Sequence, residues 1–151
     1  MPSTEKTNSV HTSTLLSRIF KTSNITACIK TNEHQMNTPA FSAYITALCA
    51  GRGLVPQRVI TKADLENSYG HQLFKGSRKP SRDTVIKLAF GFDADLELTQ
   101  EMLKYSRTVP LYPRVKRDAV LIYCLKHRLS LLEAQALLQE LEMPLLGGER
   151  T

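Results

Sequence analysis

Apolar residues recur along this chain at the spacing of a helix, and no segment shows the sustained two-residue alternation of a half-buried strand. Residues 41–49 show this most clearly, because Phe41, Tyr44, Ile45 and Leu48 fall at positions i, i+3, i+4 and i+7, the stripe of an amphipathic helix. We therefore expect an all-α fold. The segments expected to be helical after residue 53 are 56–63, 69–74, 81–91, 96–105, 115–127 and 130–143.

The N-terminal residues differ in composition from the rest. Residues 1–13 are rich in Ser, Thr and Asn without apolar periodicity, which predicts a disordered tail. Residues 14–30 are expected to form one or two short helices that can dock on the main body. The expected segments that follow are a polar linker at 31–38, a main body at 39–107, a helical hairpin at 108–146 and a tail at 147–151.

A shift of 35 residues aligns the second half of the main body with the C-terminal hairpin. Arg82-Asp83 then falls on Arg117-Asp118, and Gln100 falls on Gln135. Two amphipathic helix pairs of equal length also align in part by chance, so coincidence stays open. A genuine repeat would stack the second hairpin beside the first and extend the core. The matching apolar residues are Val85 with Val120, Ile86 with Leu121, Leu96 with Leu131, Met102 with Leu137, and Leu103 with Leu138.

Twenty Lys and Arg against fourteen Asp and Glu give a net charge of +6, and the excess is concentrated in two segments. Residues 51–82 hold seven basic and two acidic residues, a net +5, and residues 112–128 hold five and one, a net +4. A basic block beside an acidic remainder is the electrostatic footprint of a nucleic-acid-binding protein. A solvated charged face is the alternative.

Residues 59–89, VITKADLENSYGHQLFKGSRKPSRDTVIKLA, contain a short helix, a turn, a second short helix, a glycine, a basic loop and a capped helix. This is the layout of a helix-turn-helix. The run FKGSRKPSRDTVIKLA resembles the recognition-helix end, loop and next helix of the Cro/phage-repressor-type (XRE) DNA-binding family, and the resemblance covers residues 41–92. Further on, LYPRVKRDAV and LSLLEAQALL are similar to a less characterised group of bacterial regulators with the same added helices.

The resemblance implies a five-helix repressor-like core, extended by the C-terminal hairpin and a short N-terminal helical segment, with a recognition helix from about Asn67 to Lys75. It implies a bacterial or phage transcriptional regulator that binds double-stranded DNA as a homodimer. Asn and Gln amides pair bidentately with adenine, and basic loop residues hold phosphates; each position is otherwise simply exposed. The positions that match base readers are Asn67, Ser68, His71 and Gln72, and those that match phosphate contacts are Gln57, Arg58, Lys75, Ser77, Arg78 and Lys79.

Three residues depart from the family's pattern. Ile60 replaces a small Ala, Asp64 replaces the turn glycine, and Gly70 replaces a buried aliphatic residue. Asp tolerates left-handed geometry, so the turn is expected to survive. A glycine inside a helix costs about 1 kcal/mol relative to Ala. We expect Tyr69 or Phe74, both more typical of the core than of a base-stacking surface, to fill the space that Gly70 leaves.

These departures leave a second hypothesis open, a protein-interaction adaptor with little or no operator-specific DNA binding. In that case the C-terminal helices bind an unknown acidic partner through Arg114, Lys116 and Arg117. In the first hypothesis the last three helices form the dimer surface, because paired leucines there offer more apolar area than one hairpin needs. The pairs lie at 131–132, 137–138 and 145–146.

No spacing of the four histidines and three cysteines matches a metal-binding motif, and the sequence shows no nucleophile–base or paired-carboxylate arrangement. We therefore expect no metal, no cofactor and no enzymatic activity. An odd number of widely separated cysteines is typical of the reducing cytoplasm. No apolar run is long enough for a membrane helix.

Overall fold

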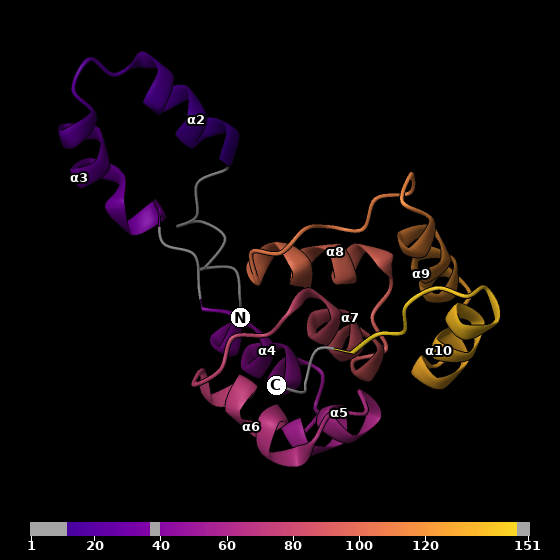
Figure 1. Ribbon diagram of the computed structural model, residues 1–151. Helices are drawn as coiled ribbons and strands as arrows, with labels where there is room; N and C mark the ends of the chain where they lie inside the picture. Colours follow the sequence, from indigo (N-terminus) through magenta and orange to yellow (C-terminus); the bar gives the residue numbers. More distant parts are fainter. Residues whose placement is uncertain (1–11, 37–39, 148–151) are drawn as a thin grey trace. The chain divides into compact units, whose positions relative to one another are not determined.

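The computed structural model describes residues 12–36 and 40–147, and every regular element in these ranges is a helix (Figure 1). The all-α expectation is therefore confirmed for this part of the chain. The chain divides into two compact units, one up to Thr38 and the other from Pro39 onward.

The N-terminal unit is a pair of helices, α2 (Thr12–Lys21) and α3 (Ile25–Met36). Asn24 begins α3, because its side-chain oxygen accepts the N–H of Ala27 at 3.1 Å. α2 begins inside the segment expected to be a tail, whose residues 1–11 lie outside the described part of the chain.

α3 continues through residues 31–36, where the sequence indicated a polar linker. The reason is visible at Asn32, which is buried although it is polar. Its side chain accepts a hydrogen bond from Arg18 of α2 and donates to the carbonyl oxygen of Cys28 at 2.8 Å. The Asn32 side chain therefore makes its hydrogen bonds within the helix pair, and it can be buried without water.

The described part of the C-terminal unit holds seven helices close to their expected positions. Four of them begin at a side-chain cap, because Glu66, Ser81, Asp95 and Ser130 each accept the N–H of the residue three positions later. The helices are α4 (Phe41–Gly51), α5 (Pro56–Lys62), α6 (Asn67–Lys75), α7 (Arg82–Gly91), α8 (Leu96–Tyr105), α9 (Lys116–Lys126) and α10 (Leu131–Glu140).

All seven of these helices end in the same way. Each is closed by a residue of positive φ, and the next N–H bonds to the carbonyl oxygen five residues earlier. This left-handed cap satisfies carbonyls at the helix end and reverses the chain within a few residues. The residues of positive φ are Gly53, Asp64, Gly76, Asp93, Arg107, Arg128 and Glu142.

α7 is the central helix of this unit (Figure 1), and all of its residues from Thr84 to Gly91 are buried. It packs against α5, α8 and α10. At Gly91 a β-carbon would come within 2.7 Å of the Val59 carbonyl oxygen. This glycine therefore allows α7 and α5 to approach closely, and α5 is held directly on the core.

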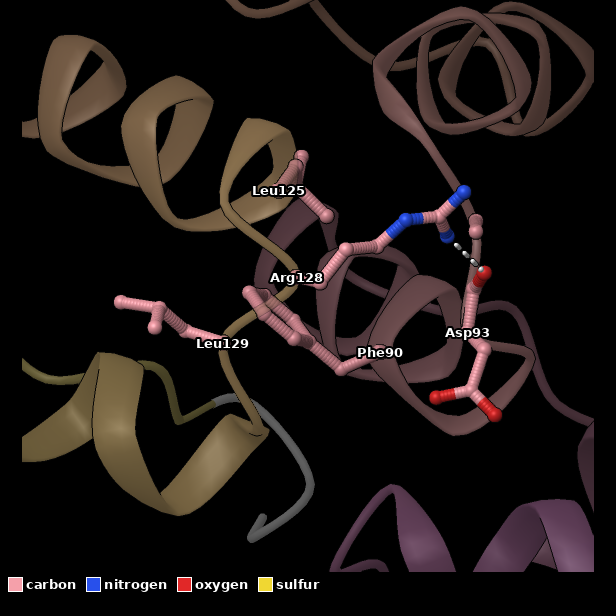
Figure 2. A pocket seen from close by; sticks show the side chains of 6 residues that line it. Phe90, Asp93, Leu125, Arg128 and Leu129 are labelled. Atoms are coloured by element: carbon pink, nitrogen blue, oxygen red, sulfur yellow. Dashed lines mark hydrogen bonds between the residues drawn. The ribbon is translucent and has the colours of Figure 1, made fainter.

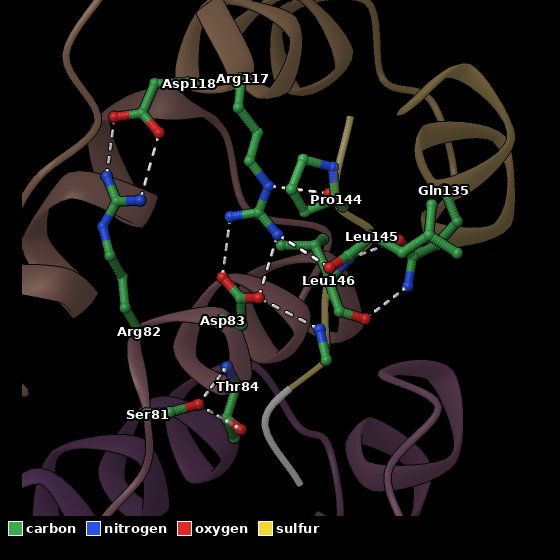
Figure 3. A network of polar contacts seen from close by, with 11 residues as sticks. Ser81, Arg82, Asp83, Thr84, Arg117, Asp118, Gln135, Pro144, Leu145 and Leu146 are labelled. Carbon is green, nitrogen blue, oxygen red and sulfur yellow. Dashed lines mark hydrogen bonds and ion pairs between the residues drawn. The ribbon is translucent and has the colours of Figure 1, made fainter. Parts of the chain in front are cut away.

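The 35-residue repeat extends to the hydrogen bonds of the two hairpins, α7–α8 and α9–α10. Arg82 donates to the Asp118 carboxylate at 2.8 and 3.1 Å, and Arg117 donates to the Asp83 carboxylate through both terminal nitrogens at 3.0 Å (Figure 3). Each guanidinium also donates to two carbonyl oxygens after its own hairpin, those of Val109 and Pro110 for Arg82 and of Pro144 and Leu145 for Arg117.

The two hairpins pack on each other reciprocally. α10 packs on α7 and α8 packs on α9, and the two Arg–Asp pairs cross in the same manner, as in an interface between identical halves. The described tail residue Gly147 completes this arrangement, since its N–H donates to Asp83 at 3.1 Å. One leucine of each predicted pair is buried in the core. The three buried leucines are Leu131, Leu138 and Leu146. The hairpins therefore use internally part of the apolar surface that the sequence indicated for a dimer.

Candidate nucleic-acid interface

α6 packs one side against α4 and α5 and presents the other side to solvent. Tyr69, Gly70 and Leu73 form its buried side. At about 100° per residue, the polar residues of the other side occupy an arc of roughly 140°. These outward residues, all exposed or half-buried, are Asn67, Ser68, His71, Gln72 and Lys75. The four predicted base readers thus share one accessible face with Lys75, the last residue of α6.

The space at Gly70 is filled from α5. A β-carbon at Gly70 would lie 2.6–3.0 Å from three side-chain atoms of Ile60, which is fully buried. The expectation that Tyr69 or Phe74 fills this space is wrong. Tyr69 is buried elsewhere in the core, where its hydroxyl lies 3.2 Å from Thr84 Oγ1. The large side chain on α5 and the missing side chain on α6 therefore compensate each other.

The turn between α5 and α6 is formed without a glycine. Asp64 has a φ of 56°, and the N–H of Leu65 bonds to the Ile60 carbonyl oxygen at 3.1 Å. Glu66 then caps α6, because its side chain accepts the N–H of Tyr69 at 2.8 Å. The cap starts α6 two residues earlier than its apolar pattern indicated, so that Asn67 belongs to the first turn.

Hydrogen bonds link three predicted site residues across α5 and α6. The Gln57 amide donates to Asn67 Oδ1 at 2.8 Å, and its oxygen lies 2.9 Å from His71 Nε2. Gln57 also donates to Thr61 Oγ1 at 3.1 Å. Gln57, predicted to contact phosphate, is therefore bonded to two predicted base readers. Thr61 was not predicted as a site residue; it joins this network from within α5, four residues after Gln57, and this i, i+4 spacing is visible in the sequence.

The loop after α6 is organised around Arg78. Its guanidinium carbon lies 5.2 Å from the centroid of the Tyr69 ring, within cation–π range, and one nitrogen lies 3.5 Å from Gln72 Oε1. The loop begins at Gly76, whose φ is 88°. Ser77 follows, and its hydroxyl donates to the Gln72 carbonyl oxygen at 3.4 Å. The loop is thereby tied to the last two turns of α6.

The cations of residues 51–82 divide into two groups. Arg52 donates to the Phe92 carbonyl oxygen, Lys62 pairs with Asp93, and Arg82 pairs with Asp118; these three hold elements together. The other four are exposed, and no ion pair within residues 12–36 and 40–147 engages them. They are Arg58, Lys75, Arg78 and Lys79, and each of them is a predicted phosphate contact.

The second basic segment, residues 112–128, divides similarly. Arg117 pairs with Asp83, and Arg128 donates to the Asp93 carbonyl oxygen at 3.1 Å. Arg114 and Lys116 are exposed. Of the three cations predicted to bind an acidic partner, Arg117 therefore serves the contact between the hairpins.

A small cavity of about 140 Å³ lies between the turn after α7 and the turn after α9 (Figure 2). Its lining residues are equivalent in the 35-residue repeat, Phe90 with Leu125, Asp93 with Arg128, and Ala94 with Leu129. The Asp93 carbonyl oxygen already accepts a hydrogen bond from Arg128 (Figure 2). The cavity is therefore a product of how the two hairpins meet.

The described residues show few features suited to nucleophilic catalysis, metal binding or insertion into a membrane. All three cysteines are buried and unpaired, and burial raises the pKa of the Cys49 and Cys124 thiols, which makes them poor nucleophiles at neutral pH. Across the described ranges, no three His, Cys, Asp or Glu side chains gather in a way that could hold a metal ion. None of the helices described there has both the length and the apolarity needed to span a membrane.

Comparisons of the chain with protein-family models, with curated proteins and with solved structures gave no match. The function of the α6 face is therefore argued from its own geometry and charge.

Proposed function

We propose that the protein is a sequence-specific DNA-binding transcriptional regulator of the Cro/phage-repressor type, which acts in the bacterial cytoplasm and places α6 in the major groove. The observation that carries the proposal is the coincidence of two features at α6. Its outward side is an unbroken face of amide, hydroxyl and imidazole groups, and exposed cations without ion-pair partners in the described part lie on it and in the loop that follows. Base readout needs the first feature and phosphate binding needs the second.

In this proposal helices α4 to α8 are the five-helix core, and α5 and α6 are its helix-turn-helix. α6 enters the groove while α5 crosses the phosphate backbone, with Arg58 exposed on α5 as a contact. The remaining residues divide into base readers, Asn67, Ser68, His71 and Gln72, and phosphate contacts, Lys75, Ser77, Arg78 and Lys79.

Gln57 has a positioning role in the proposed interface. Because it bonds to Asn67 and His71, it holds both side chains in one orientation before DNA is bound. We expect Gln57→Ala to alter the preference for bases and to leave the salt dependence of binding unchanged. Weaker binding to all duplexes alike, with the preference for bases unchanged, would return Gln57 to the phosphate role.

Titration of a mixed-sequence duplex at several salt concentrations tests the phosphate contacts. With four exposed cations each neutralising one phosphate, log K should fall against log [salt] with a slope of about −3.6 per protomer. Replacing both Arg78 and Lys79 by Ala should weaken binding to all duplexes alike and reduce the slope by about 2. The matched control replaces Arg114 and Lys116 by Ala, which removes the same charge away from α6. Equal losses in the two double variants would contradict the proposed interface.

The adaptor hypothesis has lost two of the observations that motivated it. Ile60 fills the space at Gly70, and Asp64 forms the turn, so neither departure disrupts the α5–α6 pair. Its remaining support is the exposure of Arg114 and Lys116. It predicts that the chain captures one acidic protein stoichiometrically and binds DNA weakly, with no dependence on salt.

A further inference from the structure

The 35-residue repeat relates a buried side of α7 to an exposed side of α9. On α7 this side lies under α5 and α6, because the Tyr69 hydroxyl of α6 lies 3.2 Å from Thr84 Oγ1 and Gly91 allows α5 to approach closely. Leu88 lies between them on the same stripe and is fully buried. Thirty-five residues later the equivalent residues are all exposed, and they are Ala119, Tyr123 and Lys126. The side of α9 that corresponds to the covered side of α7 is therefore open to solvent.

This side of α9 combines an apolar and aromatic centre with positive charge. Its residues fall within an arc of about 100° around the helix. Tyr123 is 53 % exposed, and the centroid of its ring lies 4.2 Å from that of the His127 ring. Asp118, the only acidic residue of α9, is buried away from this side and pairs with Arg82. The α9 face consists of Lys116, Ala119, Tyr123, Lys126 and His127.

We propose that the α9 face binds a helix of a partner protein, in the position that α5 takes on α7, and that this helix carries an apolar stripe flanked by Asp and Glu. The form of the partner follows from the repeat, since the equivalent side of α7 packs against a helix. Its charge follows from Lys116 and Lys126, which are exposed and form no ion pair with any residue that the structure describes. Opposite charges across an interface speed the encounter and fix its register.

The residues that differ between α7 and α9 suit a partner that binds reversibly. Leu88 and Gly91 of α7 are apolar and stay covered. Their equivalents on α9, Tyr123 and Lys126, each carry a polar end that water solvates when the partner is absent. Tyrosine is also enriched at protein interfaces, where it is a frequent hot spot.

A protein helix suits the α9 face better than nucleic acid does. Lys116 and Lys126 lie about 15 Å apart along the helix axis, at 1.5 Å per residue, with Ala119 and Tyr123 between them. This centre can pack against an apolar stripe, whereas the phosphate backbone of a duplex is held by cations. The inference therefore goes beyond the proposed function of α6 and does not depend on it. It also differs from the adaptor hypothesis, because Arg117 takes no part and α6 stays free to bind DNA.

Selection against the full chain from a displayed library of helical peptides of about 18 residues, five turns, tests the proposal. The enriched peptides should carry apolar residues three and four positions apart, with Asp or Glu beside them. For a synthetic copy of the most enriched peptide, Tyr123→Ala should weaken binding at least about thirtyfold, as the loss of a hot-spot tyrosine does. Tyr112→Ala is the matched control, because Tyr112 is 52 % exposed and lies outside α9. It should leave the affinity unchanged.

The charge of the α9 face is tested with the same peptide. Lys126→Glu should weaken binding at least about tenfold, because it places like charges opposite each other. Lys104→Glu makes the same change at an exposed position of α8 and should have little effect. Circular dichroism checks that each variant keeps its helices.

A selection that enriches no acidic peptide, or a peptide whose binding both Tyr123→Ala and Lys126→Glu leave unchanged, would overturn the proposal. Two further results would also overturn it by naming another occupant. If Lys126→Glu weakened duplex DNA binding much more than Lys104→Glu, the face would belong to nucleic acid. If Tyr123→Ala dissociated a dimer in sedimentation velocity, the face would belong to a second copy. A chain that binds the peptide through this face but binds no DNA supports the α9 face and contradicts the proposed function.

Discussion

At the scale of single residues, Ile60 and Gly70 decide how α6 packs on α5. Gly70→Ala should lower the free energy of unfolding by about 1–3 kcal/mol, although Ala is the better helix former, because the new methyl group meets Ile60. Ile60→Ala should lower it by about 2–5 kcal/mol by leaving a cavity. The double variant should lose at least about 1 kcal/mol less than the sum, because the Ala methyl enters the vacated space. Urea unfolding measures all three, and strictly additive losses would show that the two residues do not share this space.

The left-handed helix ends offer a second test at the residue scale. Arg107 is exposed and has a φ of 62°, a conformation that costs a non-glycine residue about 1–2 kcal/mol. Arg107→Gly should therefore raise the free energy of unfolding by about 0.5–1 kcal/mol, after the larger entropy of the unfolded glycine chain is subtracted. Arg114→Gly is the control, since Arg114 is exposed without a positive φ. Thermal unfolding should show no stabilisation there.

At the scale of helices, the crossed Arg–Asp pairs join α7 to α9. Burial alone would raise the pKa of Asp83, but hydrogen bonds from Arg117 and the Gly147 N–H, together with nearby positive charge, outweigh burial and hold this pKa below its usual value. An aspartate with a lowered pKa stabilises the fold above its unfolded pKa of about 3.9 and loses that contribution as the pH falls through the folded pKa.

Arg117→Met should therefore destabilise the protein in a pH-dependent way. At neutral pH we expect a loss of about 2–3 kcal/mol, because Asp83 stays partly buried without its cation. The difference between wild type and variant should shrink as the pH falls below the unfolded pKa of about 3.9 and then through the lowered pKa of folded Asp83, because the carboxyl group is then protonated in both proteins. Urea unfolding at each pH measures this, with the exposed Arg114→Met as control. A loss that is the same at every pH would mean that packing, and not the ion pair, is responsible.

The sequence predicted the helices well because each has apolar periodicity and end signals of its own, such as Ser81 and Gly91 for α7. It failed where a long-range contact decides. α3 continues through residues 31–36 because Asn32 meets Arg18 of another helix, which no local pattern reveals. Ile60 and Gly70 were visible as separate departures, but only the packing of α5 on α6 shows that they compensate. The repeat showed which residues are equivalent, whereas the crossing of Arg82 to Asp118 depends on how the hairpins meet.

At the scale of the whole molecule, the second hairpin is part of the core of the C-terminal unit. Leu138 is fully buried, whereas Leu132 is 79 % exposed. Leu138→Ala should lower the free energy of unfolding by about 2–5 kcal/mol, and Leu132→Ala should change it by less than about 0.5 kcal/mol. Because α10 packs on α7, hydrogen exchange should report the loss for Leu138→Ala in α6 as well as in α10. A loss confined to α9 and α10 would mean that the hairpin unfolds separately.

The central claim is that α6 reads DNA sequence, and selection of binding sites from randomised duplex DNA tests it most directly. The wild type should enrich a two-fold-symmetric site with half-sites about 10 base pairs apart. Gln72→Ala, selected in parallel, should relax the preference at one base pair of each half-site and keep the others. If the wild type enriched no sequence over the starting pool, the claim would be contradicted.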